Sequence, residues 1–283
     1  MLPCYRTLGI ARGCNPLFPK LRRFFVSPKA AVFSFHRLRK ATCMLFKAQF
    51  EIVESPAKVI EPITKFGGQP IWIAPPLWPL SPETGEQMTF LGQIALTEHI
   101  FPNSNGRIVY LFFSNESEPL YNEAFAATIQ LPGEVYTGTK GIEFVAMATG
   151  PSLYELDINR QIIYKEYKVI IFPEEEEISV PLQERYNPMT DVDYTAGFNF
   201  SKPELAGNKI GGQPLYIGHL TNPPQDLSSD QWLLLMQLAP LQGYWKNLQP
   251  NFYPFQMELG EFGILTVLIS LDYAEVSCNV QQP

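Results

Sequence analysis

The sequence repeats a nine-residue segment, and this repeat restricts the possible folds more than any other feature. Residues 65–73 read Lys-Phe-Gly-Gly-Gln-Pro-Ile-Trp-Ile and residues 209–217 read Lys-Ile-Gly-Gly-Gln-Pro-Leu-Tyr-Ile, with six of nine positions identical. In each copy a glutamine, Gln93 or Gln237, follows 28 residues after the lysine. A solenoid needs at least three repeats. Two copies in matching order therefore predict two related lobes within one fold.

Each copy continues with two apolar segments. The first surrounds the glutamine and the second ends in serine, and together they cover residues 90–96, 108–114, 233–239 and 264–270. Short apolar runs bounded by turn residues are typical of buried strands. The pseudo-repeats therefore span residues 65–114 and 209–270. Each is expected to form a strand, a long loop, a second strand, a turn and a third strand.

The remaining patterns also favour strands over helices. The chain has 26 prolines and only 17% charged residues, which argues against long charged helices. Gly-Gly permits a tight reversal with positive φ, and the proline after it suits an edge strand. Edge strands are expected at 71–73 and 215–217, further strands at 46–53, 142–148 and 161–172, a solvated loop at 174–177, and short helices at 122–130 and 152–159. The predicted class is mainly β, or α+β with minor helix, in one compact unit of two related β-rich lobes.

An abrupt change of charge separates residues 1–43 from residues 44–283. The first segment holds nine of the 21 Lys and Arg residues and no acidic residue, whereas the second holds 12 basic and 28 acidic residues, a balance of 12 − 28 = −16. Such a change marks a segment of different origin or purpose. We expect residues 1–43 to be a disordered or non-native N-terminal extension. A transit peptide and a nucleic-acid-binding arm are the alternatives.

Cysteine usage and hydropathy indicate the compartment. Three of the four cysteines lie within residues 1–43, and only Cys278 remains in residues 44–283. The second segment therefore has no intrachain disulfide and no cysteine metal cluster. No apolar run approaches the roughly 20 residues that span a membrane. The expected location is the cytoplasm, with no membrane partner.

The order of these motifs resembles the YwqG-like family of bacterial proteins of unknown function. The resemblance rests on a Lys-x-Gly-Gly turn, a glutamine-bearing apolar strand and a later strand ending in serine, and covers residues 65–114 and 207–271. Its most specific part is residues 207–217, and residues 168–172 resemble the strand between the two halves of the family. The resemblance implies a β-rich cytosolic protein of two related halves. It implies no activity.

The chain departs from the family pattern at two positions. The family often has an acidic cluster directly after the second glutamine strand, where residues 238–241 read Leu-Ala-Pro-Leu. A Trp-Gly-Asp-x-Gly turn is common before the last strand, where residues 259–263 read Leu-Gly-Glu-Phe-Gly. No cation site built from those acids is therefore expected here.

Residue types suited to catalysis are scarce. Residues 44–283 contain only two histidines, His99 and His219, and no Gly-x-Ser-x-Gly motif. The clustered Cys and His residues that hold zinc are absent, and Asp191 and Asp193 suit a turn. Lys-x-Gly-Gly lacks the following Lys-Ser/Thr of a phosphate loop. We therefore predict no catalytic residue, metal or cofactor, and the acidic charge argues against nucleic-acid binding.

Candidate residues for a cleft or an interaction surface come from the repeat and its loops. They are Lys65, Gln69, Trp78, Gln93, Lys209, Gln213, His219 and Gln237. The amides of the two strand glutamines either satisfy backbone groups in the core or form a polar pair between the lobes, and buried polar groups favour the first interpretation. The two lysines either cap carbonyls or line an anion-attracting groove. Aromatic residues of the proline-rich loop 74–82 are expected mostly to pack, with any exposed ones forming a protein-contact surface.

Two hypotheses of function follow from these observations. The first is a non-catalytic binding or protein-interaction module, whose negative field would attract a basic protein partner. The alternative is an enzyme with a carboxylate and lysine site in the cleft between the lobes. The second hypothesis predicts a pocket containing an acidic residue with a perturbed pKa.

Overall fold

The computed structural model describes residues 44–114, 125–177, 208–214, 231–238, 259 and 263–281. All of these residues belong to one of the two compact units of the chain, residues 42–283. Predictions for residues 1–43, for the edge strand at 215–217, for Asp191, Asp193 and His219 lie outside the described residues. Among the residues described, no helix is long and apolar enough to cross a membrane.

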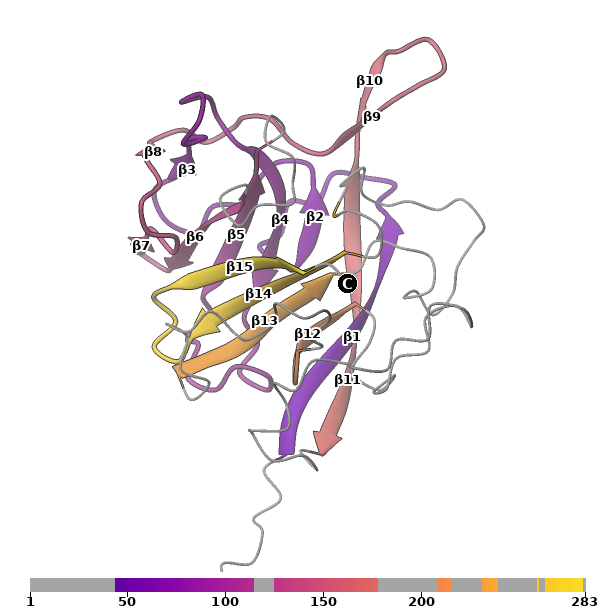
Figure 1. Ribbon diagram of the computed structural model, residues 1–283. Coiled ribbons are helices and arrows are strands. Elements are labelled where there is room, and N and C mark those ends of the chain that lie inside the picture. Colours follow the sequence, from indigo (N-terminus) through magenta and orange to yellow (C-terminus); the bar gives the residue numbers. More distant parts are fainter. Residues whose placement is uncertain are drawn as a thin grey trace, which may run out of the picture. The chain divides into compact units, whose positions relative to one another are not determined.

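The described residues form a mainly β structure. The strands are β1 (Met44–Glu54), β2 (Lys65–Gly67), β3 (Trp78–Pro79), β4 (Thr89–Ala95), β5 (Ile108–Phe113), β6 (Phe125–Leu131), β7 (Glu134–Tyr136), β8 (Phe144–Val145), β9 (Tyr154–Leu156), β10 (Ile162–Tyr164), β11 (Glu166–Glu177), β12 (Lys209–Gly211), β13 (Trp232–Leu238), β14 (Ile264–Ser270) and β15 (Val276–Gln281). Eleven of them form one antiparallel sheet in the order β15-β14-β13-β12-β1-β11-β2-β4-β5-β6-β7. The hairpin β9–β10 and the pair β3–β8 are separate two-stranded sheets (Figure 1). The predicted fold class is therefore confirmed.

The long central pair β1–β11 divides this sheet into two halves of matching construction. Lys65 pairs with Gln93 across β2 and β4, and Lys209 pairs with Gln237 across β12 and β13. The register shifts between Phe90 and Gly92 in β4, and at the corresponding position, between Leu234 and Met236, in β13. The repeated sequence thus produces the same pairing in both halves of one continuous sheet. An origin by duplication stays a prediction.

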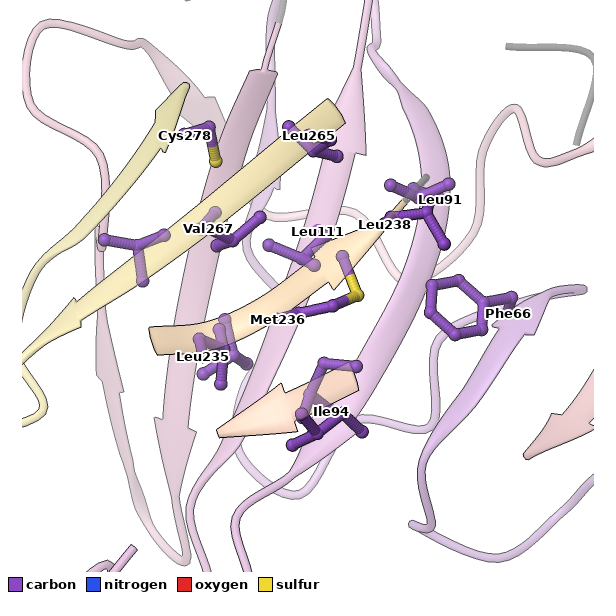
Figure 2. Close-up of a cluster of buried hydrophobic side chains, with 14 of the residues drawn as sticks. Phe66, Leu91, Ile94, Leu111, Leu235, Met236, Leu238, Leu265, Val267 and Cys278 are labelled. Atoms are coloured by element: carbon purple, nitrogen blue, oxygen red, sulfur yellow. The ribbon is translucent and has the colours of Figure 1, made fainter. Parts of the chain in front are cut away.

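The inner face of the sheet encloses the larger core. Alternate residues of each strand point to it, as the period of two requires. Figure 2 shows side chains of β13 and β14 meeting those of β2, β4 and β5, so that the two halves of the curled sheet pack against each other. Residues labelled there from one half are Phe66, Leu91, Ile94 and Leu111, and from the other Leu235, Met236, Leu238, Leu265, Val267 and Cys278.

A second, smaller core lies on the outer face of strands β4, β5 and β6. It contains Trp78, Met88, Phe90, Ile108, Tyr110, Phe112 and Ala126. The segment from Gln69 to Trp78, which we call the outer segment, contributes Trp78, and Trp72 and Ile73 pack against the cluster. Strands of this half are therefore buried on both faces, which explains their nearly continuous apolar sequences.

Both predicted helices are wrong. Residues 125–131 form strand β6, in which Phe125, Ala127 and Ile129 face the inner core while Thr128 and Gln130 alternate with them. The two alanines resemble a helical pattern, but pairing with β5 imposes a period of two. Residues 154–156 form strand β9 of a hairpin.

Four further segments also differ from the prediction. Residues 71–73 do not form a strand. The strand of this copy lies earlier, at Lys65–Gly67, and is β2. Residues 174–177 are the end of β11, where each glutamate pairs with a β1 residue, so they are not a loop. The predicted strand at 161–172 is divided into β10 and β11 at Lys165, and that at 142–148 is reduced to Phe144–Val145.

Candidate functional site

Lys65 is fully buried and forms an ion pair with Glu166. The Lys65 Nζ lies 2.5 Å from Glu166 Oε1, and the Val59 N–H donates to Glu166 Oε2 at 3.1 Å. Strand β2 directs Lys65 to the outer face, opposite to Phe66, and β11 begins beside it at Glu166. A buried ammonium requires such a partner. Lys65 therefore serves an internal contact.

Burial lowers the pKa of Lys65 below its ordinary value, although the Glu166 carboxylate opposes the shift. Desolvation is the larger effect because it penalises the charged ammonium. A lysine of lowered pKa can act as a base or nucleophile only when a substrate reaches it. The side chain of Lys65 is inaccessible to solvent in this fold.

Gln93 and Gln69 use their amides to hold backbone groups. The Ile71 N–H donates to Gln93 Oε1 at 2.9 Å, and Gln93 Nε2 donates to the Ile63 carbonyl at 2.8 Å. Gln69 Nε2 donates to the Gly150 carbonyl and its Oε1 accepts the Gly150 N–H, at 2.9 and 3.1 Å. Both amides are therefore paired twice with backbone, which supports the structural interpretation of Gln93.

Further side chains of the outer face hold the outer segment, and sequence reasoning missed them. Gln130 Oε1 accepts the N–H groups of Ile73 and Ala74, both at 3.0 Å, and Gln130 Nε2 donates to the Pro75 carbonyl at 2.9 Å. Tyr110 donates to the Ile71 carbonyl at 2.8 Å, and Thr128 to the Leu77 carbonyl at 2.8 Å. Their signal was available in the sequence, as polar residues alternating with apolar ones in a buried strand.

Trp78 is a core residue of the outer face. Its side chain is fully buried, its Nε1 donates to the Met88 carbonyl at 2.8 Å, and its ring meets that of Phe112 edge-on at 5.0 Å between centroids. The loop 74–82 thus uses this aromatic residue for packing, as buried tryptophans with a satisfied N–H do. Trp78 is not available to a partner in this fold.

The second copy places its candidates in matching positions. Lys209, Gln213 and Gln237 are buried, and Lys209 lies opposite Gln237 as Lys65 does opposite Gln93. Strands β1 and β11 separate β12 from β2, so the two lysines stand on strands about 14 Å apart along the sheet. The structure therefore unites each lysine with its own glutamine and keeps the two pairs apart. His219 is outside the residues described.

The side chains of His99 and Cys278, which could also be reactive, pack against neighbouring residues. His99 lies against the Phe46 ring at 4.4 Å between centroids. Burial raises the pKa of the Cys278 thiol to about 12, which keeps it protonated and unreactive. Within the part of the chain that the structure describes, no three His, Cys, Asp or Glu side chains gather where a metal ion could bind.

Exposed apolar side chains concentrate on the hairpin β9–β10. The hairpin extends beyond the end of β11, away from the other strands (Figure 1). Its exposed large apolar residues are Tyr154, Ile158, Ile162, Ile163 and Tyr164, and those of the neighbouring segment 53–63 are Val53, Ile60 and Ile63. We call these eight residues the hairpin patch. Sequence reasoning missed it, because the pattern of residues 161–172 predicted a strand without indicating which faces are covered.

Backbone and side-chain contacts join the two parts of the hairpin patch. The Ser55 N–H donates to the Glu166 carbonyl at 2.9 Å, and Glu54 pairs with Lys165 at 3.5 Å. The Val59 N–H binds Glu166 as described above. Segment 53–63 is thereby held against the base of the hairpin.

Comparisons with known proteins identify no relative: no family model and no curated protein matches the chain.

Replacing Gln130 by leucine is expected to destabilise the fold by about 1–3 kcal/mol. The change removes the partner of two N–H groups and one carbonyl of the outer segment, a partner that the fully buried Gln130 side chain supplies. Urea denaturation of both proteins measures the difference. The matched control is Gln87→Leu, since the half-buried Gln87 side chain donates to the Met147 sulfur in a solvent-exposed contact, and we expect less than about 0.5 kcal/mol there. An equal loss in both variants would contradict the role of Gln130.

Proposed function

We propose that the chain is a non-catalytic protein-interaction module and that the hairpin patch is its contact surface. The observation that carries this proposal is the clustering of exposed apolar residues: the described residues include twelve exposed large apolar side chains, and eight belong to this patch. Apolar residues scattered singly over a surface are ordinary, whereas a cluster marks an interaction site.

The geometry of the hairpin supports the proposal. Tyr154 pairs with Tyr164, and Ile162 lies two residues from Tyr164, so these three side chains share one face of the ribbon. A two-stranded ribbon is only marginally stable in water when neither face is covered. Burial of this face against a partner would supply the missing contacts.

The state of the candidate reactive residues supports it as well. Lys65 is inaccessible and paired with Glu166, and the amides of Gln69 and Gln93 hold backbone groups. Side chains used in this way stabilise the scaffold and offer nothing to a substrate. The interaction hypothesis is therefore preferred to an enzyme using a lysine and a carboxylate between the two halves.

The proposal includes a family and a location. The repeated Lys-x-Gly-Gly turns and glutamine strands support distant membership of the YwqG-like family. The single cysteine in residues 44–283 supports a reducing compartment, and we place the protein in the cytoplasm.

Affinity capture with the full-length chain tests the proposal. Tagged wild-type protein, the variant Ile162→Asp/Tyr164→Ser and the variant Leu271→Asp are compared as baits in native cell extract. We expect a stoichiometric partner, either another protein or an untagged copy, with the wild type and not with the hairpin variant. Leu271 is the matched control, because it is an exposed apolar residue of a turn outside the patch.

The two variants must first show wild-type circular dichroism and thermal unfolding. A partner that both variants retain would place the contact surface elsewhere. The absence of any stoichiometric partner in all three captures would contradict an interaction function.

A further inference from the structure

We propose that the hairpin patch binds a second copy of the same chain, with the two hairpins antiparallel, so that the tip of each meets the base of the other. This inference rests on the proposed function and names the partner. Such an interface is isologous: the same patch is used by both copies, and every contact occurs twice.

The charge of the hairpin favours a second copy over a basic partner. Residues 154–165 contain two acidic and two basic residues, 2 − 2 = 0, and residues 53–63 contain Lys58 against Glu54 and Glu61, 1 − 2 = −1, whereas residues 44–283 carry 12 − 28 = −16. Two strongly acidic bodies repel when they approach through most of their surface. A neutral apolar hairpin that projects from the sheet lets two copies meet with little of this repulsion.

Tip and base of the hairpin each present an exposed charged side chain of opposite sign, Arg160 and Glu54, and each stands beside a residue of the other sign, Asp157 or Lys165. Arg160 is at the tip, in a turn that Asp157 organises by accepting the N–H groups of Asn159 and Gln161. Glu54 is at the base, where 66% of its side chain is exposed beside Lys165. An antiparallel arrangement brings Arg160 of each copy towards Glu54 of the other. A parallel arrangement would instead oppose like charges.

The apolar residues follow the same two-fold pattern. Ile158 at the tip is 98% exposed and Ile60 near the base is 76% exposed. In the antiparallel arrangement, Ile158 of each copy would cover Ile60 of the other. Ile162 stands between tip and base and would meet its own equivalent near the two-fold axis, whereas Tyr164 stands at the base, opposite Tyr154. The distance from base to tip, four residues of strand from Tyr154, is about 13 Å.

The experiment is a charge swap on the full-length chain, measured by sedimentation velocity over about 1–100 µM, a range that includes weak and transient interfaces. Wild type is expected to dimerise. Arg160→Glu and Glu54→Arg each create two like-charge contacts per dimer, and each should raise the dimer Kd at least tenfold at low salt. An equimolar mixture of the two variants should restore the Kd to within about threefold of wild type, because their heterodimer regains both opposite-charge contacts.

Two further variants separate the patch from the fold. Ile162→Asp should abolish the dimer, and Leu271→Asp should leave it unchanged. A wild-type chain that stays monomeric over the whole range overturns the inference, as does a dimer that neither charge reversal weakens or that mixing fails to restore. A hairpin-dependent partner captured from extract, with a monomeric purified chain, would overturn this inference alone and leave the proposed function standing.

Discussion

Replacing Glu166 by glutamine is expected to destabilise the protein by about 3 kcal/mol at neutral pH. The substitution keeps the shape and one accepting oxygen, for either Lys65 or Val59; it removes the negative charge and replaces the second oxygen by an NH2 group that cannot accept. Lys65 is fully buried, and among the residues that the structure describes Glu166 is the acidic group that pairs with its ammonium. Urea denaturation at pH 7 measures the change.

A double-mutant cycle provides the control. Lys65→Met alone should cost less than Glu166→Gln, because 14% of the Glu166 side chain is exposed and its carboxylate stays partly hydrated. Lys65→Met combined with Glu166→Gln completes the cycle and should lose less stability than the two single losses added together, because it leaves no unpaired buried charge. Additive losses in the double variant would show that the two side chains do not interact.

The pH dependence gives an independent readout of the same pair. Burial lowers the pKa of Lys65 in the folded state below its value of 10.5 in the unfolded state. Between the two values the unfolded chain binds more protons, so stability rises with pH and the rise ends near 10.5. Loss of the Glu166 charge lowers the folded-state pKa further and widens this window. We therefore expect the deficit of Glu166→Gln to shrink as the pH rises from 7 towards 10, a trend absent from a protein carrying Lys65→Met.

This outcome would also decide between the two functional hypotheses. A lysine whose main energetic role is to match Glu166 belongs to the scaffold, in which it joins β2 to the start of β11. If Lys65 were catalytic instead, removing the Glu166 charge would leave the stability of the fold nearly unchanged and would alter the rate of a reaction. A change in stability of less than about 0.5 kcal/mol in Glu166→Gln would therefore weaken the structural role and revive the enzyme hypothesis.

The sequence predicted the strands whose pattern is local. The Gly-Gly pairs at 67–68 and 211–212 were expected at positive φ, and all four residues have it. The apolar runs around Gln93 and Gln237 form β4 and β13, and the runs that follow form β5 and β14. Each of these features depends on a few adjacent residues, so it can be predicted from the local sequence without knowledge of distant contacts.

Features that depend on distant partners could not be predicted in the same way. Residues 71–73 have the composition of an edge strand, but their backbone groups bind the side chains of Gln93, Tyr110 and Gln130 instead of a neighbouring strand. Glu166 gains its role only because β11 pairs with β2, 101 residues away from Lys65. The hairpin patch likewise depends on which faces the tertiary fold leaves uncovered.

Replacing Trp78 by alanine is expected to cost about 3–5 kcal/mol, because the variant loses a large buried side chain and leaves a cavity. The ring is enclosed tightly: a Cβ added at Gly150 would lie 2.8 Å from one of its carbon atoms. Its Nε1 bond to Met88 is lost as well. Thermal and urea denaturation measure the loss, and loss of the near-ultraviolet circular dichroism of the packed rings would accompany it.

Trp72→Ala is the matched control and separates packing from recognition. Trp72 is only half-buried and its Nε1 donates to Ala148 at an exposed position, so its removal should cost about 1–2 kcal/mol. Trp78→Phe should recover much of the stability, since it refills most of the cavity. If Trp78→Phe folds and retains both partner capture and dimerisation, the loop 74–82 acts only as a cover of the outer core. If it folds but loses them, the loop 74–82, which Trp78 holds on the outer core, is the contact surface in place of the hairpin.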